Sequence, residues 1–266
     1  MIKIATPVSC LFLDESMARD ISALSDCLEG RDATMEMSCF GIELFHCEAH
    51  PCRQMTEQEF KHISGIRERF GGLKLFSFHL ISNYQDPELR DKMYIPGGKS
   101  YGRDELLANA KRNISRIKDI LGAGVEIALE NNNFFPTGAY LHVTDADFIG
   151  QIVEENGLFL LLDVAHSKIT AHNRKIAWRD YLRMLPLDRV IQAHVSRSGL
   201  RPDGLAFDAH QPLLKEDWDD LRNVLALCKN IEYVTLEVYK DKTVIVDGLK
   251  KMREVLNELS GKFVRM

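Results

Sequence analysis

The chain has 266 residues, of which 45% are hydrophobic and 27% are charged, and its formal net charge is −5. Such a length can bury the core of one large α/β domain, and a barrel of about 250 residues is a frequent single-domain solution. The acidic balance excludes a basic nucleic-acid footprint over the whole surface, and no apolar run reaches the roughly 18 residues of a membrane helix. We therefore expect a cytoplasmic protein that acts on a small-molecule or peptide substrate and has no membrane partner; a nucleic-acid partner is disfavoured, and the oligomeric state is left open.

Short apolar, β-rich segments recur along the chain and predict the strands of a parallel sheet. Several are nearly continuous runs of Leu, Ile, Val and Phe, which is typical of strands buried on both faces. In chain order the predicted strands are 2–8, 41–46, 73–80, 125–131, 158–165, 189–196 and 233–239, and residues 32–39 are a candidate for one more.

Amphipathic segments lie between these strands and predict helices. Thr56 and Glu59 have the spacing of a capping box, which marks the start of the first helix. Apolar residues then recur every three or four positions, as on the buried face of a helix. The predicted helices are 56–70, 103–121, 144–156 and 242–259, with a further helix start in 214–222 and one long loop at 85–104.

The alternation of strands and helices predicts an α/β fold with a parallel sheet. Strand–helix units that follow one another roughly every 30–40 residues favour a single (β/α)8 TIM barrel that spans residues 1–266. A seven-stranded or irregular barrel is the alternative. A doubly wound sheet is disfavoured because no G-x-G-x-x-G motif follows the first predicted strand.

Acidic and imidazole side chains stand at or just after the ends of the later predicted strands. In a TIM barrel these strand ends converge on one mouth, where several carboxylates without a cation would repel one another strongly. A set of carboxylates and imidazoles without cysteine suits iron, zinc or manganese better than a structural zinc site. The candidate metal ligands are His79, Glu130, Asp163, His166, His194, Asp208, His210 and Glu237.

At these residues the sequence resembles the xylose-isomerase-like TIM barrels, and the resemblance covers residues from about 73 to 240. Members of that superfamily hold a metal with Glu, Asp, His and Glu from successive strands. The resemblance gives these roles to Glu130, Asp163, His194 and Glu237.

Two further motifs resemble those of the abasic-site endonucleases of this superfamily, which bind three metals. Their D-x-x-H motif matches Asp163 and His166, and their D-x-H motif matches Asp208 and His210 in the loop after the strand 189–196.

The segment 129–173 resembles another branch, the multinuclear non-haem iron enzymes of the methanobactin-biosynthesis type. Both have E-N, then a helix, then L-L-L-D, and an Asn ten residues after that Asp, here Asp163 and Asn173. His166 stands where this branch has an Asn. The resemblance implies oxidation of cysteines in ribosomal peptides by two or three divalent metal ions, with iron favoured and zinc or manganese as alternatives.

We expect two ions rather than three, because only His79 among the early histidines belongs to a convincing ligand position. His46 is placed at the mouth as a substrate contact, together with Arg197 and Arg201, which suit a phosphate or a carboxylate. The run HCEAHPC (46–52) is interpreted as a loop that faces the substrate, with a metal or redox site as the alternative.

The sequence leaves several functions open. A non-haem iron oxidase that acts on a peptide or small thiol is favoured. A metal-dependent sugar or sugar-phosphate isomerase or epimerase is the alternative, in which Glu130 and Glu237 move a proton next to a carbonyl and His166 holds a hydroxyl. A metal-dependent phosphodiesterase or abasic-site endonuclease is a further alternative, and a barrel that only stores metal is disfavoured.

Overall fold

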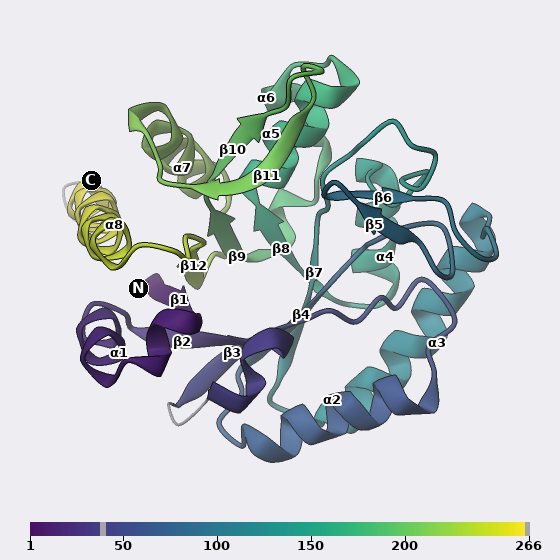
Figure 1. The fold of residues 1–266 in the computed structure, drawn as a ribbon, viewed down its shortest axis with the longest axis horizontal. Helices are drawn as coiled ribbons and strands as arrows, with labels where there is room; N and C mark the ends of the chain where they lie inside the picture. Colours follow the sequence, from purple (N-terminus) through teal and green to yellow (C-terminus); the bar gives the residue numbers. More distant parts are fainter. Residues whose placement is uncertain (38–40, 264–266) are drawn as a thin grey trace.

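Eight parallel strands close into a barrel in the computed structural model, which describes residues 1–37 and 41–263 (Figure 1). The first strand pairs with both the second and the last, so the barrel has no open edge. The predicted TIM barrel is thereby confirmed. Around the barrel the strands are β1 (Lys3–Pro7), β12 (Tyr233–Leu236), β9 (Val190–Val195), β8 (Phe159–Asp163), β7 (Glu126–Glu130), β4 (Leu75–His79), β3 (Ile42–Cys47) and β2 (Cys27–Arg31).

Helices surround the barrel and cover the outer faces of its strands (Figure 1). The capping box predicted from Thr56 and Glu59 is present at the start of α2. None of the helices in the described part of the chain is both long and apolar enough to cross a membrane. The helices are α1 (Glu15–Ser22), α2 (Glu57–Arg69), α3 (Arg103–Leu121), α4 (Ala146–Glu155), α5 (Val164–Arg174), α6 (Trp178–Met184), α7 (Lys215–Leu227) and α8 (Lys242–Phe263), with short 3-10 turns η1 (Cys10–Leu13), η2 (Asp32–Met37) and η3 (Leu187–Arg189).

Two β-hairpins interrupt the regular alternation and follow strands at their carboxyl ends. The first, β5 (Glu88–Arg90) with β6 (Met93–Ile95), lies within the segment 85–104 that the sequence predicts as a long loop. The second, β10 (Arg197–Leu200) with β11 (Ala206–Gln211), carries the D-x-H motif on a strand rather than in a loop.

The eighth strand is not where the sequence places it. Residues 32–37 form the 3-10 turn η2, residues 38–40 lie outside the described part of the chain, and the strand is β2, at Cys27–Arg31. Its sequence, CLEGR, lacks an apolar run because its inward-facing positions carry charged groups.

The predicted strand 158–165 is also too long. Strand β8 ends at Asp163, and α5 begins at the next residue with Asp163 as its N-cap. The carboxylate of Asp163 accepts a hydrogen bond from the amide of His166, so His166 lies in the first turn of α5 and not on the strand.

The barrel interior has an apolar floor with a polar layer above it. Side chains of a strand alternate between its two faces, so every second residue faces inward. The floor consists of Ala5, Cys27, Leu44, Leu75, Ala128, Leu161, Ile191 and Tyr233. Two residues further along their strands come Glu29, His46, Ser77, Glu130, Asp163 and Thr235, all buried.

Replacement of a floor residue should destabilise the whole barrel. The side chain of Leu161 is fully buried, and Leu161→Ala should lower the free energy of unfolding by about 2–5 kcal/mol because it leaves a cavity. Urea denaturation would measure this loss. Leu200→Ala is the control, since Leu200 is exposed. Equal stability of the two variants would contradict a packed floor.

Candidate metal centre

The first group of potential ligands joins three neighbouring strands, β3, β4 and β7. Nδ1 of His79 lies 2.6 Å from Oε2 of Glu130, and Nε2 of His46 lies 3.4 Å from the same oxygen. The Nε2 atoms of His46 and His79 are 2.8 Å apart. Burial, together with the neighbouring His79, lowers the pKa of His46 to about 4, which keeps this imidazole neutral and able to bind a cation.

The second group uses strands β8 and β9 and the residue after β12. Nδ1 of His194 lies 3.5 Å from Oε1 of Glu130 and 3.5 Å from Oε2 of Glu237. Ligand atoms of Asp163, His194 and Glu237 all lie within 4.8 Å of one another. Each comes from a different part of the barrel wall, as expected for a site at the mouth of a TIM barrel.

The third group lies where α5 faces the β10–β11 hairpin. Nδ1 of His166 donates to the carbonyl of Asn131 at 3.0 Å, which directs its Nε2 towards Asp208. That Nε2 lies 3.7 Å from Oδ2 of Asp208, and Nε2 of His210 lies 3.0 Å from the same oxygen. Glu130, Asp163 and His166 also form a compact group of their own.

Hydrogen bonds from outside the groups orient several of these side chains. Nε2 of His194 contacts Oε2 of Glu29 at 3.0 Å, which directs Nδ1 towards the mouth. Arg31 and the hydroxyl of Tyr239 both lie 2.6 Å from Oε1 of Glu237, so its Oε2 is the oxygen left to bind a cation.

The pKa values of the carboxyl groups at the mouth depend on whether each has a cationic partner. Burial opposes ionisation of Glu29, but His194 and Arg31 outweigh it and lower its pKa to about 2. For Asp163 burial dominates, and with the nearby carboxylates of Glu237 and Glu130 it raises the pKa to about 7. Asp163 is therefore the carboxylate with the poorest compensation by protein groups.

Three buried atoms of candidate ligands at the mouth have no hydrogen-bond partner: Oε2 of Glu130, Oδ2 of Asp163 and Nδ1 of His194. Buried polar atoms without partners are rare, because their desolvation is not repaid. Divalent cations would satisfy these atoms. The donor set contains only nitrogen and oxygen, and it fits iron, zinc or manganese. The residues present therefore fit a metal centre.

The groups are not separate. Glu130 belongs to the first group and also to the compact group with Asp163 and His166, and Asp163 belongs in turn to the group with His194 and Glu237. Shared carboxylates are able to bridge neighbouring ions, so the arrangement suits a multinuclear centre.

The structure brings all the predicted metal ligands to this mouth. His46 differs from its predicted place as a substrate contact: it is 3% exposed and lies among ligand atoms, which favours a role as a ligand. Sequence reasoning missed Glu29 and Arg31, because β2 was misplaced. The spacing of Cys27, Glu29 and Arg31, with every second residue facing inward, is the signal that could have found them.

The two predicted substrate arginines have different surroundings. Nη1 of Arg201 donates to the carbonyl of Asp91 at 2.8 Å, and its Nε contacts Oδ2 of Asp203, so its guanidinium is engaged in joining the two hairpins. Nε of Arg197 is buried and has no hydrogen-bond partner.

A cavity of about 260 Å³ adjoins the centre. Its lining includes four of the candidate metal ligands, His79, His166, Asp208 and His210. The β5–β6 hairpin and the loop after β7 also line it, with Leu89, Lys92, Tyr94, Asn132, Asn133 and Tyr140. The segment predicted as a long loop thus forms part of the cavity wall.

Comparisons with known proteins give a family and a fold. A family model described as "RiPP precursor modification enzyme MbnB/TglH/ChrH" matches residues 13–257. A UPF0276 protein of Shewanella loihica is 27% identical over 156 residues, 59% of this chain and 52% of its own length. A UPF0276 protein of Bordetella pertussis is 30% identical over 129 residues, 47% of this chain and 44% of its own length. The chain matches about half the length of these curated relatives.

Solved structures with the same fold include a D-tagatose 3-epimerase-like protein, with a TM-score of 0.61 and 17% identity, covering 98% of this chain and 100% of its own. A xylose isomerase domain protein from Alicyclobacillus acidocaldarius has a TM-score of 0.62 and 14% identity, covering 97% and 99%. These likenesses show the fold and nothing of the activity.

Loss of the carboxylate behind His194 should weaken metal binding. Glu29→Gln removes the charged partner of Nε2 of His194, and we expect affinity for Fe²⁺ or Co²⁺ to fall about 10- to 100-fold, because such partners orient metal-binding imidazoles. Competition with a chelator would measure it. Glu43→Gln, at a partly exposed ion pair with Lys3, is the control. Unchanged affinity in Glu29→Gln would refute the role given to Glu29.

Proposed function

The chain belongs to the MbnB/TglH/ChrH family of enzymes that modify RiPP precursors, which are ribosomally made peptides, and from this premise we propose that it is a non-haem iron oxidase of a cysteine-containing peptide. Family and fold together make it a metal-dependent TIM-barrel enzyme. The observation that carries the finer proposal is the set of adjoining ligand groups, which share Glu130 and Asp163.

The number of potential ligands supports a multinuclear centre. A one-metal isomerase of this fold requires only a set such as Glu130, Asp163, His194 and Glu237. The chain has additional buried or half-buried candidate ligands around that set, and a single ion would not coordinate them. These additional ligands are His46, His79, His166, Asp208 and His210.

We therefore propose three ions, in place of the two that the sequence favours. His46, His79 and Glu130 would hold one ion. A second would be held by Glu130, Asp163, His194 and Glu237. The third would be held by His166, Asp208 and His210.

Iron is the proposed metal, with zinc or manganese as the alternatives. When bound, iron supplies dioxygen binding and the transfer of electrons from the substrate thiol. The nitrogen and oxygen donors of the mouth suit this metal, and they leave a thiol of the substrate as a possible sulfur donor.

Residues of the chain orient the candidate ligands and limit which substrates reach the centre. Arg31 and Tyr239 hold one oxygen of Glu237, and Glu29 holds His194, so the ligands are fixed before a substrate arrives. The walls of the adjoining cavity limit access to the centre. Glu130, Glu237 and His166 are the residues to which we assign direct roles in the reaction.

Elemental analysis and Mössbauer spectroscopy of protein from iron-supplemented cells test the proposal. We expect three irons per chain, and thiol-dependent oxygen uptake with short peptides that contain Cys but not with their Ser counterparts. One ion per chain, with epimerisation of a ketose and no change of the iron signals on addition of thiol, would support the isomerase alternative instead. Two or three zinc ions with cleavage of abasic DNA would support the nuclease.

Replacement of the shared carboxylate should empty part of the centre. Asp163→Asn should lose at least one ion per chain, because its unpartnered oxygen Oδ2 is lost as a charged ligand. Asp203→Asn, at an exposed contact with Arg201, is the matched control and should keep its metal. Full metal content in Asp163→Asn would exclude Asp163 as a ligand.

We also propose that Arg197 binds an anionic group of the substrate, because its buried Nε has no partner in the protein. Arg197→Gln should weaken binding of a Cys-containing peptide about 10- to 100-fold, the worth of a charged hydrogen bond. The loss should vanish for a peptide with an amidated C-terminus if the anion is the terminal carboxylate. Arg183→Gln on the exposed face of α6 is the control. An equal loss for both peptides would exclude the carboxylate.

A further inference from the structure

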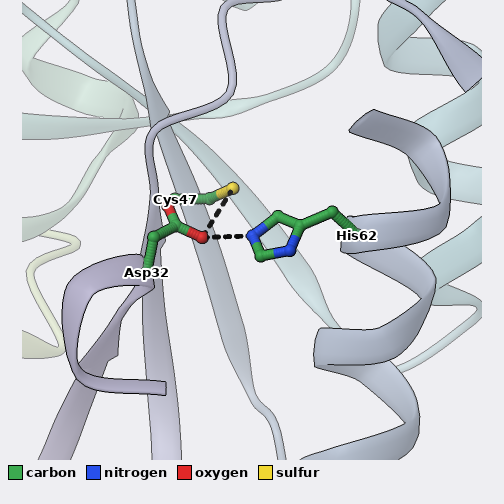
Figure 2. A group of neighbouring side chains, drawn as sticks. All are labelled: Asp32, Cys47 and His62. Carbon is green, nitrogen blue, oxygen red and sulfur yellow. Dashed lines mark hydrogen bonds and ion pairs between the residues drawn. The ribbon is translucent and has the colours of Figure 1, made fainter. Parts of the chain in front are cut away.

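A second group of metal-ligand side chains lies outside the barrel interior. Asp32 begins η2, Cys47 ends β3 and His62 lies on α2, and Figure 2 shows their side chains converging. Successive residues of a strand face opposite sides, so Cys47 lies on the helix side of β3 while His46 lies in the barrel mouth. This group is therefore distinct from the centre described above.

The ligand atoms are close enough to share one ion. Sγ of Cys47 lies 3.9 Å from Oδ1 of Asp32, and Nε2 of His62 contacts the same oxygen. All three ligand atoms lie within 4.8 Å of one another. Two ligands of a tetrahedral zinc ion, with bonds of about 2.0–2.3 Å, stand roughly 3.3–3.6 Å apart. Small side-chain adjustments would therefore suffice.

The surroundings protect the sulfur and leave an approach for an ion. Cys47 is 1% exposed, whereas the side chain of His62 is 43% exposed and that of Asp32 is 18% exposed. The backbone amide of Glu48 donates to Oδ2 of Asp32 and fixes the carboxylate, which leaves Oδ1 facing the other two ligands. An ion would enter from the side of His62.

We propose that Asp32, Cys47 and His62 bind a divalent, borderline-soft cation, Zn²⁺, with water at a fourth position. One sulfur, one nitrogen and one oxygen are a donor set that zinc accepts, and tetrahedral coordination leaves one position open. On binding, the thiol of Cys47 loses its proton to solvent, and the Zn–S bond forms with no change of oxidation state.

The two sites differ in chemistry, so the protein can sort metals between them. The centre at the mouth offers only nitrogen and oxygen, whereas this site adds a thiolate, which favours softer ions. Strand β3 supplies adjacent residues to both sites, His46 to the mouth and Cys47 to the zinc site. The zinc site is argued from its own contacts and does not depend on the proposed oxidase activity.

Titration of the full-length apoprotein with Co²⁺ tests the zinc site, because only a thiolate ligand gives a sulfur-to-cobalt charge-transfer band in the near ultraviolet. We expect the final intensity of this band to correspond to one thiolate-bound Co²⁺ per chain, in addition to the Co²⁺ held at the barrel mouth, and the band to disappear when Zn²⁺ is added. Cys47→Ser should abolish it, and Cys228→Ser, at a buried thiol outside every described ligand group, should not. Asp163→Asn should keep the band, which separates this test from that of the proposed oxidase.

His62→Ala provides a second test that does not disturb the buried residues. We expect it to weaken Co²⁺ binding at the thiolate site at least tenfold, while the metal content of the barrel mouth stays the same. The proposal is overturned if the wild-type protein shows no thiolate band, or if the band survives in Cys47→Ser. In either case Asp32 would serve only as a hydrogen-bond acceptor that joins η2 to α2.

Discussion

The mutual repulsion of buried carboxylates is the constraint on which the rest of this structure depends. Glu29, Glu130, Asp163 and Glu237 all lie in the barrel interior or at its mouth and are at most 3% exposed. Arg31 and the imidazoles compensate three of them, which holds the pKa values of Glu29, Glu130 and Glu237 low against the effect of burial. Asp163 has a raised pKa, because the neighbouring cationic groups of the protein do not offset its burial and the nearby carboxylates.

The scaffold stabilises the fold enough to offset the unfavourable burial of these charges. Every second side chain of a strand faces the barrel interior, and these inward side chains form first the apolar floor and then the polar layer above it. The packed floor and the surrounding helices stabilise the folded state. The mouth can therefore hold charged groups that lower the stability of that state. The fold therefore separates the residues that stabilise from those that bind.

The barrel and the placement of most candidate ligands at its mouth could be predicted, because long apolar strands that end in Glu, Asp or His are conspicuous in the sequence. Strand β2 was misplaced because Glu29 and Arg31 interrupt it with charges whose partners come from β9 and from the residue after β12. Such partners are far away in sequence, and no local pattern indicates them. The proximity of His46 to His79 and Glu130 has the same cause, because only the folded barrel brings these three side chains together.

The two hairpins beside the cavity are joined to each other as well as to the barrel. Nη1 of Arg201 donates to the carbonyl of Asp91, and Nζ of Lys92 donates to the carbonyl of Asp208. These bonds cross between segments more than a hundred residues apart and involve neither the floor nor most of the ligand strands. Insertions in the turn at Asp91 can therefore reshape the cavity while the ligands on the strands stay in place.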